Sequence, residues 1–264
     1  MAQTPAPAAT VALNLPLFRG ERRLRIALVG LPNSGVTTLF EAVRSTAVSH
    51  GRLAGTQSTY DECAVQTGFD EARVIALPSM HSLRHGGDAD RAAFKYLLWG
   101  DERPPVSSHE PDGPPAPFAP PDVIVQVIDA TTLERHLELT LELAQLGRPL
   151  VIALNKMDEA QDRGLYINSV VLGAELGATV VRTVATMGHG IADVFRAAFA
   201  SMRAKKLPRP QPPSPHIAQA LAPLERLLAA PAVAQAFRVP TPLLTGEIAA
   251  GDPWFLIELA QEPR

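Results

Sequence analysis

The loop Gly30-Leu31-Pro32-Asn33-Ser34-Gly35-Val36-Thr37, followed by Thr38, carries the most chemically informative spacing in the chain. Its glycines follow G-x-x-x-x-G-K-[ST], a loop whose backbone amides surround phosphates at the amino end of a helix. That chemistry also needs a lysine on the β- and γ-phosphates and a hydroxyl on Mg²⁺. Thr37 supplies the hydroxyl, but Val36 stands where the lysine belongs. We predict phosphate contacts from Asn33 to Thr38 that lack one charge-assisted contact, typically worth about 1.5–3 kcal/mol.

A second informative segment, Asn155-Lys156-Met157-Asp158, directly follows the apolar run from Pro149 to Leu154. In an N-K-x-D tetrapeptide the aspartate carboxylate can accept from both the N1 and N2 donors of guanine, a pair that adenine lacks. The asparagine braces such a site and the lysine stem lies along the ring. Taken alone, each segment could be an ordinary turn. Their order along the chain favours a guanine nucleotide as the ligand.

Short apolar runs predict the strands that position these loops. The expected strands are Leu24–Val29, Val74–Leu77, Asp122–Ile128, Pro149–Leu154 and Ala178–Val184. The expected helices are Val36–Arg44, Thr132–Leu146 with Gly147 as its C-cap, and Ile191–Met202. Strands that alternate with helices and are apolar on both faces indicate a mainly parallel sheet covered on each side. The predicted fold class is therefore a three-layer α/β fold.

Proline-rich stretches divide the chain. Leu207–Ser214 is expected to be a linker, followed by a helix over His216–Ala230 that Pro223 would kink or start, and by a less regular stretch over Val233–Gln261. The predicted organisation is a disordered tail at 1–21, a main domain at 22–205 with a proline-rich insertion at 103–121, a linker at 206–214 and a small helical subdomain at 215–264.

Composition excludes several classes of function. The formal net charge of −3 gives no general electrostatic case for nucleic acid as a partner. Cys63 is the single cysteine, so intramolecular disulfides and multi-cysteine metal sites are excluded. No run approaches the ~20 apolar residues that span a bilayer, so we expect a cytoplasmic chain without a transmembrane segment.

The chain resembles the cytosolic G domain of the FeoB ferrous-iron transporter family over about residues 24 to 259. Its loop is similar to that family's G-N-P-N-S-G-K-T-T-L-F, and Asp129–Leu137 (DATTLERHL) is close to the family's D-A-x-x-L-E-R-N-L. Further similar segments are Leu53–Gly55, Ile75–Leu83, Thr183–Ile191 and Leu244–Pro253.

The resemblance implies a P-loop G-protein fold with a helical C-terminal subdomain, and GTP or GDP as ligand. It assigns the guanine contacts to Asn155, Lys156 and Asp158, with Ala185 and Thr186 in the loop against the base. It places Mg²⁺ at Thr37, and a K⁺ site at Asn33, which matches the family residue associated with potassium-assisted catalysis.

Departures from the family pattern cluster on the phosphate side of the site. They are Val36 for the loop lysine, Gln57 for the first-switch threonine with Thr56 as a neighbouring substitute, Ala76 for the second-switch aspartate, Ser79 for the glycine that senses the γ-phosphate, and Ala185 for the final-loop serine. Because phosphoryl transfer depends on charge positioned around the transferred group, we predict impaired hydrolysis. No residue can be assigned as a catalytic base.

The favoured interpretation is a degenerate, stand-alone FeoB-like G domain linked to ferrous iron transport. Its partner would be a membrane iron permease or another transporter component, which would place the chain at the inner face of the membrane. One alternative is a slow but active GTPase in which Lys95, Arg84 or His81 supplies charge. The other is a nucleotide-free pseudo-GTPase that acts as an interaction module, with the segment Arg103–Pro121 as a docking site.

Overall fold

The structure is a computed structural model. It describes residues 24–44, 48–53, 58–67, 70–84, 86–100 and 120–260. The predicted tail at 1–21, the switch positions Thr56 and Gln57, and nearly all of the insertion at 103–121 lie outside these ranges.

Within the described residues, the strands form one seven-stranded sheet in the order β2-β3-β4-β1-β5-β6-β7. The strands are β1 Leu24–Gly30, β2 Ser49–Arg52, β3 Thr59–Thr67, β4 Asp70–Ala76, β5 Val123–Asp129, β6 Leu150–Asn155 and β7 Thr179–Arg182. From β4 to β7 all neighbours are parallel, whereas β2, β3 and β4 pair antiparallel. The prediction of a mainly parallel sheet is confirmed.

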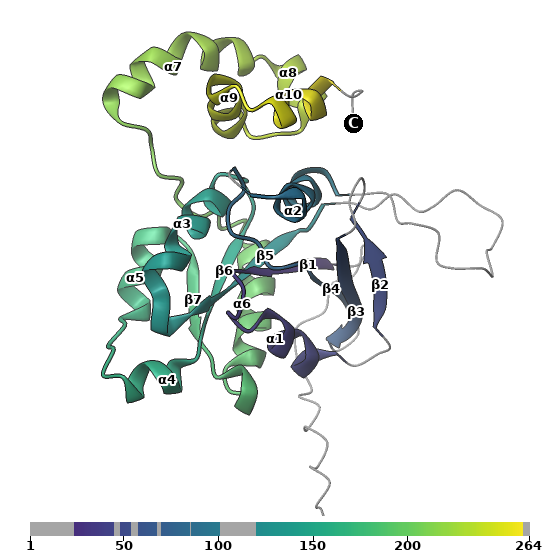
Figure 1. Ribbon diagram of the computed structural model, residues 1–264, viewed down its shortest axis with the longest axis vertical. Helices are drawn as coiled ribbons and strands as arrows, with labels where there is room; N and C mark the ends of the chain where they lie inside the picture. Colours follow the sequence, from purple (N-terminus) through teal and green to yellow (C-terminus); the bar gives the residue numbers. More distant parts are fainter. Residues whose placement is uncertain are drawn as a thin grey trace, which may run out of the picture.

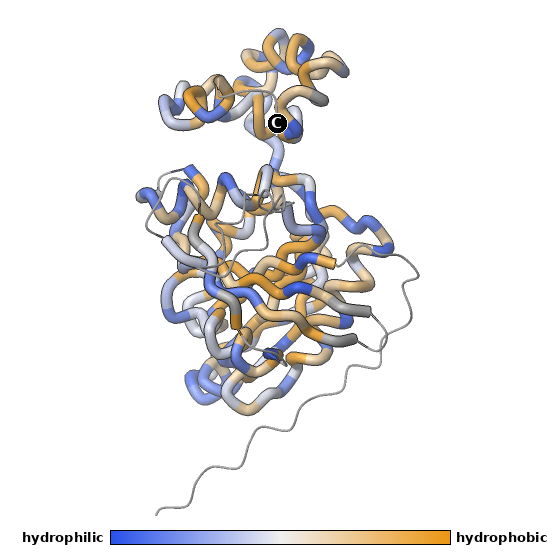
Figure 2. The backbone as a smooth tube through the Cα atoms, turned by 90° about the vertical axis from the view of Figure 1, so that its right-hand side faces the viewer, coloured by the Kyte–Doolittle hydropathy of each residue, from blue (hydrophilic) through white to orange (hydrophobic). Residues whose placement is uncertain are grey.

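Helices cover both faces of the sheet, which confirms the three-layer architecture (Figure 1). Helices α1 (Val36–Val43) and α6 (Ile191–Arg203) pack on one face, where they share a hydrophobic core with β1, β4, β5 and β6. The opposite face carries α2 (Asp88–Trp99), α3 (Leu133–Ala144) and α5 (Ser169–Leu176). Apolar segments run through the centre of the sheet domain, between these layers, and further apolar stretches lie in the C-terminal helices (Figure 2).

Short elements connect the carboxyl ends of the strands. The 3₁₀ turn η1 (Ala130–Thr132) follows β5, helix α4 (Met157–Asp162) follows β6, and the 3₁₀ turn η2 (Ala185–Met187) follows β7. In a parallel sheet these carboxyl ends lie at one edge, where ligands usually bind. The two chemically informative segments of the sequence meet at this edge.

Four helices form the C-terminal region: α7 Pro215–Leu228, α8 Pro231–Phe237, α9 Thr241–Ala250 and α10 Pro253–Ala260. Prediction of a less regular stretch from residue 233 onward was wrong. Pro240 is the N-cap of α9, and Pro242 and Pro253 stand in the first turns of α9 and α10, where a missing amide hydrogen costs little, so these prolines do not interrupt the helices. Pro223 lies inside α7 and does not begin it.

The C-terminal helices share a core with the sheet domain through α2. The ring of Phe255 stacks on Phe94 and Trp99 at centroid distances of 5.9 and 6.3 Å. The indole nitrogen of Trp99 donates to the backbone oxygen of Phe237 at 2.8 Å. Fully buried Leu244 extends the same core.

Several predicted boundaries need correction. Strand β4 begins at Asp70, four residues before the predicted start, because it continues into a polar segment that pairs with β3. Strand β7 is shorter than predicted, since Thr183 and Val184 leave the sheet to join the site. Helix α3 ends at Ala144 with Gln145 as its C-cap, so Gly147 is not the C-cap, although its φ of +62° is left-handed.

Helix α3 buries His136 almost completely, at 2 % exposure. Burial lowers the pKa of its ring below the usual 6.5, and the nearby Asp129 carboxylate only partly offsets this. As pH falls below about 6.5, the unfolded chain takes up a proton that the folded ring refuses. The free energy of unfolding should therefore fall, by at most about 1.4 kcal/mol per pH unit, until the folded pKa is reached.

We expect His136→Asn to remove this part of the acid sensitivity. Urea unfolding at about pH 7 and about pH 5.5 measures the difference for each variant. As a control, replacing the exposed His189 with asparagine should leave the pH effect of the unsubstituted chain in place. An equal pH dependence with and without His136 would contradict the assignment.

Candidate functional site

The loop between β1 and α1 has the backbone shape of a phosphate-binding loop. Asn33 and Gly35 both adopt left-handed conformations, with φ of 64° and 102°. A Cβ atom at position 35 would lie 2.2 Å from Nδ2 of Asn155, so only glycine fits there. Since α1 begins at Val36, the amides of this loop gather at a helix amino terminus.

Asn155, at the end of β6, joins three parts of the site. Its Nδ2 donates to the backbone oxygen of Ser34 at 3.0 Å. Its Oδ1 accepts from the Ala185 amide at 2.9 Å and from the Thr183 hydroxyl at 3.3 Å. The side chain is 4 % exposed. It therefore fixes the distance between the loop after β1 and the loop after β7, as the predicted bracing role requires.

The backbone of Lys156 is left-handed, with a φ of 59°, and its side chain extends toward the end of β5. Its Nζ lies 2.6 Å from Oδ2 of Asp129, whose other oxygen accepts from the amide and hydroxyl of Thr131 at 2.8 and 2.7 Å. Burial alone would raise the pKa of Asp129, but the hydrogen bonds from Lys156 and Thr131 outweigh it and hold this pKa below its usual value. The lysine charge is thus matched by a carboxylate inside the protein.

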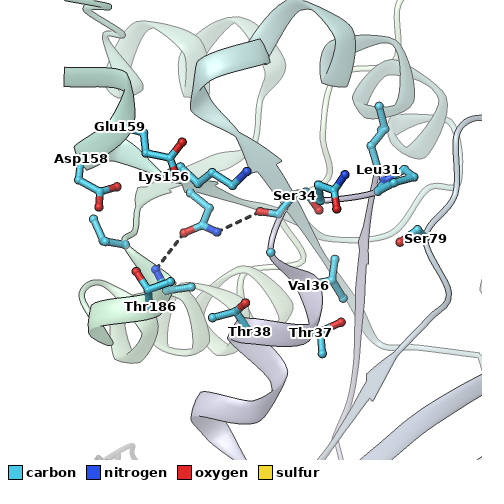
Figure 3. A pocket seen from close by; sticks show the side chains of 16 residues that line it. Leu31, Ser34, Val36, Thr37, Thr38, Ser79, Lys156, Asp158, Glu159 and Thr186 are labelled. Carbon is cyan, nitrogen blue, oxygen red and sulfur yellow. Dashed lines mark hydrogen bonds between the residues drawn. The ribbon is translucent and has the colours of Figure 1, made fainter. Parts of the chain in front are cut away.

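A pocket of about 520 Å³ opens between these loops (Figure 3). Its lining comprises Leu31, Pro32, Asn33, Ser34, Gly35, Val36, Thr37, Thr38, Ser79, Asn155, Lys156, Asp158, Glu159, Val184, Ala185 and Thr186. The structure thus brings together all the predicted phosphate and guanine residues, and Ser79 with them. Leu31 and Pro32 also line the pocket and belong to the predicted loop, and Glu159 and Val184, which were not predicted, each adjoin a predicted residue.

The Asp158 carboxylate is available to a ligand. Asp158 stands half-buried in the first turn of α4, and no described residue makes a hydrogen bond or ion pair with its side chain. Figure 3 shows it with Glu159 and Lys156 at one end of the pocket, while Val36, Thr37 and Ser79 lie at the other. This separation suits a ligand with a base at one end and phosphates at the other.

The phosphate end lacks the groups that a P-loop Mg²⁺ site requires. Thr37 offers an exposed hydroxyl, but Ala76 supplies no carboxylate and does not line the pocket. Val36 is 8 % exposed and packs with Leu39 and Phe40 in the core beneath α1. Within the described parts of the chain, no three His, Cys, Asp or Glu side chains come together to hold a metal ion. The described residues of the phosphate end, which do not include the switch positions Thr56 and Gln57, do not fit the metal.

The segment Leu77–Arg84, which follows β4 and carries Ser79, is held by hydrogen bonds along its length. The Leu77 and Met80 amides donate to backbone oxygens of β1 at 3.1 Å each. Side chains of two helices hold the rest: the His81 amide donates to Asp90 of α2 at 2.6 Å, and the Leu83 amide to Glu142 of α3 at 2.6 Å.

At its end, this segment contacts the C-terminal helices. Arg84 donates to Glu247 of α9 at 2.7 Å and to Gln145 at 2.8 Å. Lys95 pairs with Glu258 of α10 at 2.9 Å. None of the three cationic candidates of the active-GTPase alternative, Arg84, Lys95 and His81, lines the pocket.

Replacing Arg84 with methionine should destabilise the fold, because Glu247 is only 2 % exposed and would lose its partner. Buried pairs typically lose 3–5 kcal/mol in this way, but Arg84 is 35 % exposed, so we expect about 2 kcal/mol. Burial already raises the pKa of Glu247, so protonation in acid should relieve the loss and higher pH should enlarge it.

Urea unfolding of Arg84→Met in acidic and in neutral buffer measures the loss in the free energy of unfolding at each pH. The double variant with Glu247→Gln is the control, and it should recover part of the loss by removing the unpaired charge. Equal stability of the single variant and the unsubstituted chain at neutral pH would contradict an ion pair that holds the two regions together.

The sequence of the chain is similar to a known protein family and to several of its members. The profile of the family described as Ferrous iron transport protein B matches residues 24–107 and 118–198. The Fe(2+) transporter FeoB of Escherichia coli is 33 % identical over 174 residues, which cover 64 % of this chain and 20 % of that protein. The FeoB of Salmonella typhimurium is also 33 % identical over 174 residues, and the alignment covers the same fractions of the two chains. The chain thus aligns with about a fifth of the length of these relatives.

Solved structures agree. A mutant of S. thermophilus NFeoB bound to GDP has a TM-score of 0.72 and 26 % identity, covering 90 % of this chain and 84 % of that one. The cytosolic domain of L. pneumophila FeoB has a TM-score of 0.68 and 28 % identity, covering 90 % and 89 %. In the ranges described, no helix combines the length and apolar composition needed to cross a membrane. By sequence and by fold, the chain belongs to the FeoB ferrous-iron transport protein family, whose N-terminal G domain it matches.

Proposed function

We propose that the chain binds guanine nucleotide as a regulatory G domain of ferrous-iron transport, and that it hydrolyses GTP slowly or not at all. The observation that carries the binding is the unpaired Asp158 carboxylate in the pocket, beside the braced Asn155. A carboxylate in that position can accept from both donors on the guanine edge.

One relative and the pocket itself support the choice of ligand. The S. thermophilus protein was solved with GDP, and its sequence is 26 % identical to this chain. The base end of the pocket here retains the whole N-K-x-D tetrapeptide, with Ala185 and Thr186 from η2 closing the same end. Iron transport enters through the curated relatives, which are named Fe(2+) transporters. A membrane permease is the partner that this proposal implies for a chain at the inner face of the membrane.

Impaired hydrolysis follows from the phosphate end. Efficient phosphoryl transfer needs positioned positive charge, and the lysine position is a buried valine. The cations named as substitutes, Arg84 and Lys95, are engaged with α9 and α10. Asn33 lines the pocket and stays the candidate contact for K⁺, without a role in any step proposed here.

Calorimetric titration of the chain with GDP and with ADP tests the binding. We expect GDP to bind and ADP to bind at least a hundredfold more weakly, since a site that hydrogen-bonds a base edge rejects a base lacking those donors. Equal binding of both would refute guanine selection. No binding at millimolar GDP would favour the nucleotide-free pseudo-GTPase instead.

A further inference from the structure

We propose that this site recognises the guanine base and the phosphate nearest the loop, and that it gains little from a γ-phosphate or from Mg²⁺. The ligand class would be guanine nucleotides irrespective of phosphate number, bound without a metal. This inference rests on the proposed guanine-binding function, which it makes more specific.

The side chains that line the pocket offer little positive charge to a second or third phosphate. Among the described side chains that line it, Asp158 and Glu159 are acidic and Lys156 alone is basic. The Lys156 ammonium lies 2.6 Å from Asp129, so its charge is already matched. Each further phosphate adds negative charge to the ligand, and no unmatched lining cation receives it. Backbone amides and hydroxyls remain, and these are weaker partners for a highly charged group.

Val36 fills the lysine position with a buried apolar side chain. A flexible residue at the lysine position could leave room for a solvent cation, but this side chain packs against Leu39 and Phe40. A Cβ atom on Gly30 would lie 3.0 Å from its Cγ2, so the valine also packs closely against the loop backbone. The position is filled with apolar volume. It offers neither charge nor a water site to a β- or γ-phosphate.

The Leu77–Arg84 segment is held by hydrogen bonds to the sheet and to two helices. In switch proteins, contacts with the γ-phosphate and its Mg²⁺ order such a segment. Here Asp90 and Glu142 hold it from α2 and α3, and the Met80 amide donates to the backbone of β1, so its hydrogen bonds are made within the protein. A triphosphate therefore has little ordering left to drive, which removes the usual source of discrimination between GTP and GDP.

The start of α1 indicates where the nearest phosphate would contact the protein. Ser34 and Gly35 line the pocket there, and the loop amides at this helix amino terminus favour a first phosphate. The Ser34 hydroxyl lies on the other side of the loop, because a Cβ atom on Gly30, which does not line the pocket, would be 2.4 Å from its Oγ. The contact with the phosphate is therefore assigned to the backbone amides.

The test is a series of calorimetric titrations with GMP, GDP and a non-hydrolysable GTP analogue, each with Mg²⁺ and with EDTA. We expect the three dissociation constants to agree within about tenfold and not to respond to Mg²⁺. GTP analogue with Mg²⁺ binding a hundredfold more tightly than GMP would overturn this inference and leave the proposed function intact. Absence of binding by all three would overturn both.

Val36→Lys sharpens the test. Restoring the ammonium should tighten GDP and the GTP analogue by about tenfold to a hundredfold and leave GMP nearly unchanged. Val36→Met is the matched control, a longer side chain without charge, and it should not tighten the binding of GDP or of the GTP analogue. Equal strengthening by Lys and Met would overturn the charge argument. If the lysine variant does not fold, as a thermal melt would show, the unsubstituted series decides.

Discussion

Replacing Asp158 with alanine is expected to weaken GDP binding by at least a hundredfold and to remove the preference for guanine over adenine. The loss comprises two charge-assisted hydrogen bonds, each typically worth about 1.5–3 kcal/mol. ADP makes neither bond, so its affinity should hardly change. Paired titrations with GDP and ADP measure the ratio of the two affinities, which is the quantity that base selection sets.

Asp162→Ala is the matched control for this variant. Asp162 ends the same short helix, is exposed and does not line the pocket, so its removal changes the local charge equally without touching the base. It should leave both affinities as they are. A GDP-to-ADP ratio that survives in Asp158→Ala would show that another group reads the base.

Replacing Asn155 with alanine should cost about 2–4 kcal/mol of stability as well as nucleotide binding. The change leaves the Ala185 amide and the Ser34 oxygen, both deep in the protein, without their partner. It also frees the loops after β1 and β7 from each other, so the two ends of the pocket lose their spacing. Urea unfolding and GDP titration follow the two effects separately.

Asn155→Asp distinguishes loss of packing from loss of the hydrogen bonds. The aspartate has nearly the same volume and can still accept from Ala185, but it cannot donate to Ser34. It should therefore destabilise the chain for electrostatic reasons without leaving a void. A loss below about 1 kcal/mol in both variants would contradict the bracing role of Asn155.

The parallel half of the fold could be predicted from sequence because its strands are buried on both faces. β1, β5 and β6 appear as continuous apolar runs, which have few alternative interpretations. The antiparallel edge could not be predicted in this way. β2 is polar throughout, and β3 carries Asp61 and Glu62, the latter buried and paired with Arg73 of β4.

Helices could not be predicted where few of their residues are buried or where distant parts of the chain bury them. α5 contains no buried residue, so its sequence has no face to detect. α2 was missed although most of it is buried, since the core that covers it includes Phe255, more than 150 residues away in the chain. The C-terminal prolines indicate irregular structure in the sequence because a proline at the start of a helix cannot be told from one that interrupts it until the helix boundaries are known.

The position of the candidate pocket could be predicted from two short motifs, whose residues line it together. Both loops carry short motifs whose residue types are dictated by their chemistry, so position in the sequence was sufficient to name them. Glu159 and the pairing of Lys156 with Asp129 were not predicted. Net charge inside a pocket depends on which side chains neutralise one another, and that requires the distances.

The two tryptophans of the chain both lie where α2 meets α10, with Trp99 stacked on Phe255 and Trp254 beneath the Arg91 guanidinium at 5.8 Å. Indole emission responds to solvent and to nearby charge, so this junction carries its own optical reporter. Any ligand that loosens the C-terminal helices should shift the fluorescence to the red, with no label attached. Stopped-flow mixing could then time that motion directly.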